Sequence, residues 1–202
     1  MDSNSVRLRK AGNITLQSIS DEMTFFLKES RLLKSLQLYN ESSREASSPY
    51  EYSSSLKNIS VVSFRLFELY AAEGRNKVAS FYAQETQIKS LEAYKIGHQL
   101  NVQNSQWLSE LKDKQIEYVN SYLMNFLRGC KFSGDLEERV GMMVKLKEVS
   151  ADHVKCWLNF KIAEAYYHNS VSHRDCDLLI SFRSINEGYL KIFQTSFNLM
   201  RF

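Results

Sequence analysis

Proline is nearly absent from this sequence, and glycine is scarce. The 202 residues include one Pro and seven Gly, whereas an average chain of this length has about ten Pro and about fourteen Gly. These two residues punctuate strands, turns and the ends of helices. Their scarcity argues against a fold of many short elements and predicts a few long helices.

Cysteine and long apolar runs are also missing. Three cysteines, Cys130, Cys156 and Cys176, do not fit the dense, even-numbered frameworks of small secreted domains. The N-terminus, MDSNSVRLRKAGN, has no apolar stretch of signal-peptide length. No window approaches the run of about 18 apolar residues that spans a membrane. We therefore expect a cytoplasmic chain, or alternatively a nuclear one, that is neither secreted nor transmembrane.

The charge has no dominant sign. The 26 basic and 23 acidic residues give a net charge of +3, and they are spread evenly along the chain. Nucleic-acid binders usually have an isoelectric point above about 9 and a clustered basic face, whereas this chain has an isoelectric point near 8.6. The charge pattern therefore disfavours a nucleic-acid partner.

Recognisable catalytic motifs are absent as well. The sequence has no glycine-rich phosphate-binding motif, no GxSxG nucleophile motif and no Glu-x-x-His pair for a di-metal bundle. The nearest approach to a metal site is a set of histidines and cysteines, namely His153, Cys156, His168, His173 and Cys176. Their spacing matches no familiar zinc pattern, and cysteine is often a small buried residue. We predict a non-enzymatic protein without catalytic residues, cofactor or metal.

What the chain has in quantity is helix-compatible sequence with many aromatic residues, including 12 Phe and 11 Tyr. This predicts an all-α bundle of about five helices, with residues 1–17 as a polar basic tail and 18–202 as a single domain. The first helix is expected to begin at an N-cap near Ser20 and to stop before Pro49. Its apolar stripe contains Met23, Phe26, Leu27, Leu33 and Leu36.

The most distinctive prediction is one unusually long amphipathic helix or helical hairpin over about residues 50–127. Gly74 and Gly97 interrupt the pattern, at a cost of about 1 kcal/mol each. The polar patch at 101–105 is predicted to be a bend, with a continuous rod as the alternative. Further helices are predicted over about 135–166 and 179–200, with a turn at 168–175. The stripe of the long segment is Leu56, Ile59, Val62, Leu66, Tyr70, Val78, Phe81, Ile88, Leu91, Leu108, Leu111, Ile116, Val119, Leu123 and Phe126.

A long amphipathic helix needs a surface that covers its stripe. The first interpretation is therefore a helical adaptor or scaffold that binds other proteins, in an oligomer such as a homodimer or in a larger complex. As an alternative, the order of one helix, one very long helix and a last long segment resembles the BAR family of dimeric three-helix bundles. That resemblance implies a basic face on a curved membrane surface, with Arg7, Arg9 and Lys10 in the contact. An all-helical nucleic-acid binder is the third, less favoured interpretation.

The candidate interaction residues form two groups. The first is basic (Arg7, Arg9 and Lys10), and the second is the pair Tyr166 and Tyr167. Aromatic side chains could also stack on bases or dock a peptide, but helical spacing favours core packing for most of them. The aromatic side chains concerned are the pair Phe81-Tyr82 and a cluster that contains Trp157 and Phe160. The segment WLNFKIAEAYY (157–167) is similar to one helix of a tetratricopeptide repeat, in a single copy.

Overall fold

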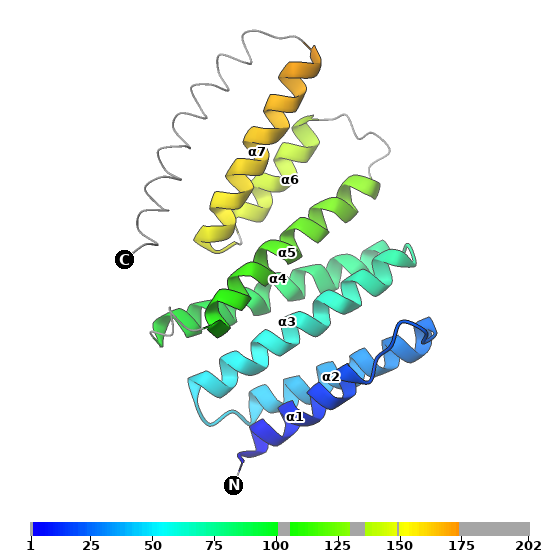
Figure 1. Cartoon of the computed structure of the whole chain (residues 1–202), viewed down its shortest axis with the longest axis vertical. Coiled ribbons are helices and arrows are strands. Elements are labelled where there is room, and N and C mark those ends of the chain that lie inside the picture. The colour runs from blue at the N-terminus through cyan, green and yellow to red at the C-terminus, as the bar shows by residue number, and fades with distance from the viewer. Residues whose placement is uncertain (1, 101–105, 130–135, 149, 174–202) are drawn as a thin grey trace. The chain divides into compact units, whose positions relative to one another are not determined.

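The computed structural model describes residues 2–100, 106–129, 136–148 and 150–173, with the side chains at 125–129, 138 and 167–173 left aside. Over these ranges the chain forms seven α-helices and no strand, which confirms the all-α prediction (Figure 1). The helices are α1 (Asn4–Gln17), α2 (Phe25–Arg44), α3 (Pro49–Ala72), α4 (Asn76–Gln99), α5 (Gln106–Gly129), α6 (Leu136–Glu148) and α7 (Asp152–His173).

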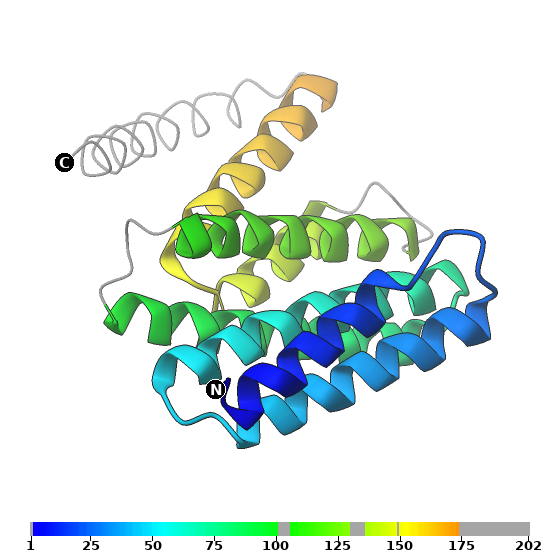
Figure 2. The ribbon, with the colours of Figure 1, turned by 60° about the horizontal axis from the view of Figure 1, so that its bottom comes forward.

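The chain forms two compact units, Met1–Tyr122 and Leu123–Phe202. In the first unit, consecutive helices run antiparallel and pack side by side: α1 on α2, α2 on α3, and α3 on α4 (Figures 1 and 2). In the second unit α6 packs on α7. No helix in the described ranges has both the length and the apolar content needed to cross a bilayer.

The N-terminal segment is a packed helix and not a tail. Ser3 caps α1, because its Oγ accepts a hydrogen bond from the Val6 amide at 3.2 Å. Ser5 is fully buried, and a Cβ built on Gly12 would lie 2.6 Å from the Tyr39 ring. The prediction of a tail is wrong because α1 packs on α2 through small residues, which leave no apolar pattern in the sequence.

The second helix also begins later than predicted. Ser20 precedes a turn, and α2 starts at Phe25 after Thr24. Its predicted end before Pro49 is confirmed, because α2 stops at Arg44 and Pro49 is the first residue of α3. A proline suits that position because its missing N–H would have no partner in the first turn.

The predicted long helix is wrong over its first half. The chain breaks at Gly74 into α3 and α4. Each of the helices α3, α4 and α5 has 24 residues. Each of these helices is about 36 Å long at about 1.5 Å per residue. The predicted bend at 101–105 lies outside the described residues. The similarity to the BAR family rested on one very long helix, so the described helices give it no support.

The prediction for the C-terminal half was partly wrong. The expected helix over 135–166 is two helices, α6 and α7, which are separated around Ser150. The expected turn over 168–175 is helical as far as His173, because α7 continues through this polar stretch. The predicted last helix, 179–200, lies outside the described residues.

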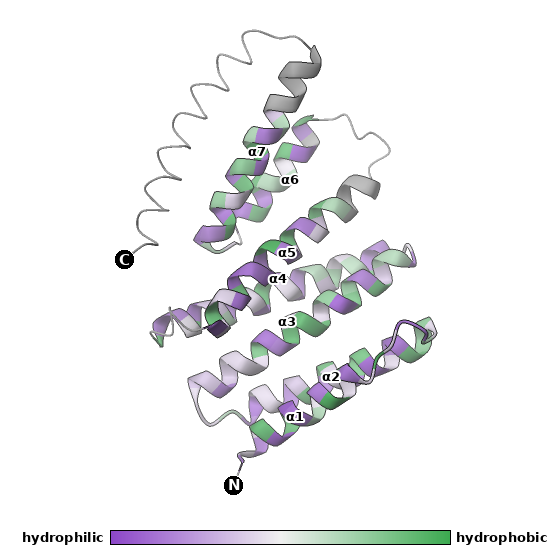
Figure 3. Ribbon diagram, in the orientation of Figure 1, coloured by the Kyte–Doolittle hydropathy of each residue, from purple (hydrophilic) through white to green (hydrophobic). Residues whose placement is uncertain are grey.

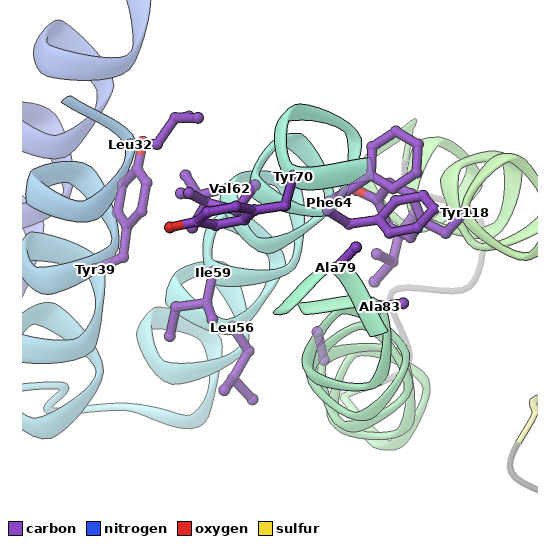
Figure 4. Close-up of a cluster of buried hydrophobic side chains, with 14 residues drawn as sticks. Leu32, Tyr39, Leu56, Ile59, Val62, Phe64, Tyr70, Ala79, Ala83 and Tyr118 are labelled. Carbon is purple, nitrogen blue, oxygen red and sulfur yellow. The ribbon is translucent and has the colours of Figure 1, made fainter. Parts of the chain in front are cut away.

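The core of the first unit is centred on α3. Five positions of its predicted stripe, Leu56, Ile59, Val62, Leu66 and Tyr70, are all buried. Figure 4 shows four of them, Leu56, Ile59, Val62 and Tyr70, between α2 on one side and α4 on the other. On the same core, the Phe64 ring of α3 packs against Tyr118 of α5 at 4.6 Å between centroids. The α3 stripe is therefore confirmed.

The buried face of α4 consists of small residues, contrary to prediction. Polar and apolar residues are interleaved along the described helices, as Figure 3 shows. The large residues Val78, Phe81 and Ile88 are exposed. Small buried side chains let α4 approach α3 closely. The residues on this buried face are Ala79, Ala83, Thr86, Ser90, Ala93 and Gly97.

At one end of the first unit the helices contact one another through three buried serines. We call these residues the serine seam: Ser5 of α1, Ser42 of α2 and Ser55 of α3. The Ser5 hydroxyl donates to the Ser42 carbonyl at 2.9 Å, and the Ser42 hydroxyl lies 2.8 Å from the Ser5 carbonyl. The Ser42 and Ser55 hydroxyls are also 2.8 Å apart. Three helices are thus joined by short polar contacts without a large side chain between them.

Candidate functional site

The predicted basic group lies on α1, where two of its members make contacts within the fold. The Arg9 Nη1 donates to the carbonyl of Glu51 at 3.3 Å. The Lys10 ammonium forms an ion pair with Asp2 at 2.5 Å. Arg7 is exposed. The structure therefore assigns Arg9 and Lys10 contacts that stabilise the N-terminal region, and it brings no cluster of unpaired cations together there.

The predicted tyrosine pair lies on α7 of the second unit. Tyr166 is half-buried, and the side chain of Tyr167 is outside the described set. On the same helix the Lys161 ammonium lies 5.8 Å from the ring centroids of both Trp157 and Phe160. The two predicted groups belong to separate units.

A more developed surface lies at the end of the first unit opposite the serine seam. Five aromatic rings follow one another there, and we call them the aromatic strip: Phe26, Phe25, Tyr70, Tyr82 and Phe81. The rings come from three helices, because Phe25 and Phe26 begin α2, Tyr70 ends α3, and Phe81 and Tyr82 lie near the start of α4. The strip therefore crosses the helices rather than following one of them.

Each ring of the aromatic strip contacts the next in a favourable geometry. Phe26 meets Phe25 edge-on at 5.5 Å between centroids, and Phe25 meets Tyr70 edge-on at 5.9 Å. Tyr70 and Tyr82 are stacked at 5.6 Å, and Phe81 meets Tyr82 edge-on at 5.2 Å. Edge-to-face and offset-stacked pairs are the arrangements that aromatic rings prefer, so each contact holds its neighbour in place.

The loop between α3 and α4 brings the helices of the strip together. Gly74 has φ +69°, in the left-handed region that glycine adopts readily. The Arg75 amide donates to the Tyr70 carbonyl at 2.9 Å, and the Gly74 amide donates to Ala71 at 3.1 Å. These two bonds form a Schellman motif. The tight reversal brings the start of α4 back beside the end of α3, and so places Tyr82 against Tyr70.

Tyr70 anchors the centre of the strip. It is buried, and its hydroxyl donates to the Glu29 carboxylate of α2 at 2.5 Å. In Figure 4 this hydroxyl points from α3 toward α2. Burial raises the pKa of the Tyr70 phenol well above its usual value, and the hydrogen bond to Glu29 raises this pKa further. Burial also raises the pKa of Tyr82. Both phenols therefore stay neutral at physiological pH.

The two outer rings of the strip are exposed. Phe26 is 71% exposed and Phe81 is 56% exposed, which together leaves roughly 200–300 Å² of aromatic surface in water. Leu27 and Val78, which neighbour them on α2 and α4, are exposed as well. An exposed apolar patch of a few hundred Å² is often functional.

The surface combines neutral hydroxyls with exposed apolar rings. The hydroxyls are those of Tyr70 and Tyr82, and the exposed rings are those of Phe26 and Phe81. Within the described ranges there is no group of three His, Cys, Asp or Glu side chains that could hold a metal ion.

Comparison with known proteins finds no matching family, no matching curated protein and no matching solved structure. The fold and the surface define an all-helical chain with an exposed aromatic strip.

Sequence reasoning found part of this surface. The pair Phe81-Tyr82 was recognised as able to dock a peptide, although core packing was favoured, and the exposure of Phe81 contradicts that preference. Phe26 was placed in a buried stripe, which is wrong because α2 buries Leu32, Ser35, Tyr39 and Ser42 instead. The sequence signal for this part of the surface is the adjacent pair Phe25-Phe26 directly after Thr24, because neighbouring helical positions face different directions and a helix with one buried face does not bury two adjacent rings equally.

Proposed function

We propose that this chain is a non-enzymatic helical adaptor or scaffold protein that binds other proteins through the aromatic strip. The observation that carries the proposal is the exposure of Phe26 and Phe81 on rings that are themselves held in place. Aromatic side chains presented rigidly have little conformational entropy to lose on binding, and they dominate many protein interfaces.

The arrangement of the helices supports the same proposal. α2, α3 and α4 each contribute to the strip, so the surface exists only when the unit is folded. Rigid elements position binding residues better than loops do. Nothing in this surface requires a cofactor or a reacting group.

The experiment is affinity purification of the intact chain from cells, comparing the wild type with the double variant Phe26→Ser, Phe81→Ser. We expect at least one protein to co-purify in near-equal amount with the wild type and to be lost from the double variant. The matched control is Ile14→Ser, because Ile14 is 69% exposed and lies outside the strip. Co-purification that is the same for all three chains, or absent from all of them, would contradict the proposal.

A further inference from the structure

The aromatic strip carries one cation in direct contact with a ring. The Arg75 guanidinium carbon lies 4.8 Å from the centroid of Phe25. Arg75 is exposed, and its side chain forms no hydrogen bond or ion pair with any residue in the described part of the chain. The guanidinium therefore lies over the Phe25 ring in a cation–π contact, while its N–H donors remain available.

We infer that the aromatic strip binds a short segment of a partner protein that carries two bulky apolar residues and a carboxylate. The apolar residues contact Phe26 and Phe81, and the carboxylate pairs with Arg75. This inference rests on the proposed function, and it names the chemistry of the partner. Guanidinium presents a planar fork of donors that matches a carboxylate with two parallel hydrogen bonds.

The area of the strip favours a short segment over a second copy of this chain. A stable interface between two folded proteins buries about 800 Å² on each side. The two outer rings supply only roughly 200–300 Å², and the neighbouring Leu27 and Val78 are themselves less than half exposed. A surface of this size suits a peptide with two anchor residues, which is a recurring mode of helix or peptide docking.

The charges around the strip orient the segment. Glu29 of α2 and Glu85 of α4 both act on Tyr82, where they add to the rise in pKa that burial causes. A carboxylate of the partner beside Tyr82 would be repelled by these two groups. At Phe25, the Arg75 guanidinium lies over the ring, and the first turn of α2 contains no acidic residue. Glu29 lies one turn later and is hydrogen-bonded to Tyr70. The carboxylate is therefore expected at the Phe25 end of the strip.

The neighbouring carboxylates do not cancel this preference. Glu29 already accepts the hydrogen bond from Tyr70. Glu73 is exposed and lies two residues before Arg75, but it forms no ion pair with Arg75. Asp21 and Glu22 precede α2 and are exposed. The strip is therefore bordered by charges of both signs, with one guanidinium in contact with a ring. This arrangement selects a segment with a single carboxylate rather than a generally acidic partner.

The test is selection from a phage library of random short peptides on the intact, immobilised chain. We expect enriched peptides to share two bulky apolar residues and one Asp or Glu. Their affinity should fall at least about tenfold for the double variant Phe26→Ser, Phe81→Ser, and about tenfold for Arg75→Glu. The control Arg44→Glu, a charge reversal at the other end of α2, should leave the affinity unchanged.

A charge swap makes the result specific. Replacing the peptide carboxylate by Lys should weaken binding to the wild type and restore it toward Arg75→Glu. Peptides without a carboxylate, or no effect of Arg75→Glu, would overturn this inference, although loss with the double phenylalanine variant would leave the adaptor proposal standing. Selection of no peptide would also overturn it. Light scattering that shows a wild-type dimer and a monomeric double variant would identify a second copy as the occupant instead.

Discussion

The two ends of the first unit are held together by different kinds of side-chain contact. At one end the serine seam joins α1, α2 and α3 through buried hydroxyls of small side chains. At the other end the aromatic strip joins α2, α3 and α4 through five rings, the outermost of which are exposed. Because α2 and α3 run from one end to the other, the same two helices change their contact chemistry along their length.

The difference separates a contact that completes the fold from a surface that is left open. Each hydroxyl of the serine seam bonds to a neighbouring helix, so its partners are all internal. The outer rings of the aromatic strip contact one ring each, and more than half of each side chain is exposed to water. Mutations at the first end should therefore act on stability, and mutations of the outer rings at the second end should act on binding.

Tyr70→Ala is expected to have the largest effect on stability, since it removes the central ring of the strip and leaves a cavity in the core. Replacing a buried aromatic residue by Ala costs about 3–5 kcal/mol. Urea unfolding followed by far-UV circular dichroism measures this loss. Tyr70→Phe keeps the ring and should cost less, and equal losses for both variants would show that the hydroxyl and not the packing matters.

Ser42→Leu tests the serine seam. Ser42 is fully buried, with oxygen atoms of Ser5 and Ser55 at 2.8 Å, so a larger side chain overpacks the contact. We expect a loss of roughly 2–4 kcal/mol in the free energy of unfolding. Ser30→Leu on the exposed face of the same helix is the control and should change stability by less than about 0.5 kcal/mol. A tolerated Ser42→Leu would mean that α1 is not tightly packed.

High pH should weaken the serine end through Tyr39. Burial raises the pKa of Tyr39 to about 12, and this effect outweighs the opposing influence of Arg65. The unfolded phenol ionises near pH 10, so its contribution to stability is complete below about pH 10 and is lost between about pH 10 and pH 12, on the order of 2 kcal/mol. Unfolding free energies across this range should fall less steeply for Tyr39→Phe. A phenolate absorbance change near pH 10 that the folded wild type shows and folded Tyr39→Phe lacks would contradict the assignment.

Gly74→Ala tests the loop that assembles the aromatic strip. A Cβ at Gly74 meets no neighbouring atom within 4 Å, but the residue has φ +69°. The left-handed conformation therefore accounts for the expected destabilisation of about 1 kcal/mol. Gly141→Ala, in the interior of α6 with equal space around it, should instead stabilise by about 1 kcal/mol. Thermal unfolding of both variants checks the opposite signs.

The smallest effect on stability is expected from the outer rings. Phe26→Ser and Phe81→Ser should each cost no more than about 1 kcal/mol, because most of each ring is in water and only one ring contact is lost. Chemical unfolding measures the change. A loss comparable to that of Tyr70→Ala would show that these rings are part of the core, and the distinction between the two ends would fail.

The sequence predicted the fold best where large apolar residues face the core. The α3 stripe was found because Leu56, Ile59 and Leu66 are both large and buried. The face of α4 was assigned incorrectly because Ala83 and Ala93 are buried whereas Phe81 and Ile88 are exposed. An apolar pattern weights residues by hydrophobicity, and it cannot show that a close helix contact needs small residues.

The candidate site could be predicted only in pieces for a related reason. Phe81 and Tyr82 are adjacent in sequence and were recognised as a pair able to dock a peptide. Their continuation through Tyr70 to Phe25 depends on the reversal at Gly74, which the sequence pattern treated as a tolerated interruption of one helix. Arg75 gained its position from the same reversal. A surface that crosses three helices requires their packing, and periodicity within one helix does not contain that information.

The pairing of each helix with the next one along the chain has a consequence for synthesis. Apart from a minor contact between α1 and α3, the strong pairings within the first four helices join sequence neighbours. Contacts that are local in sequence form quickly and need no distant part of the chain. On the ribosome, α1 and α2 can close the first contact as soon as they emerge, and each later helix then adds to a surface that already exists.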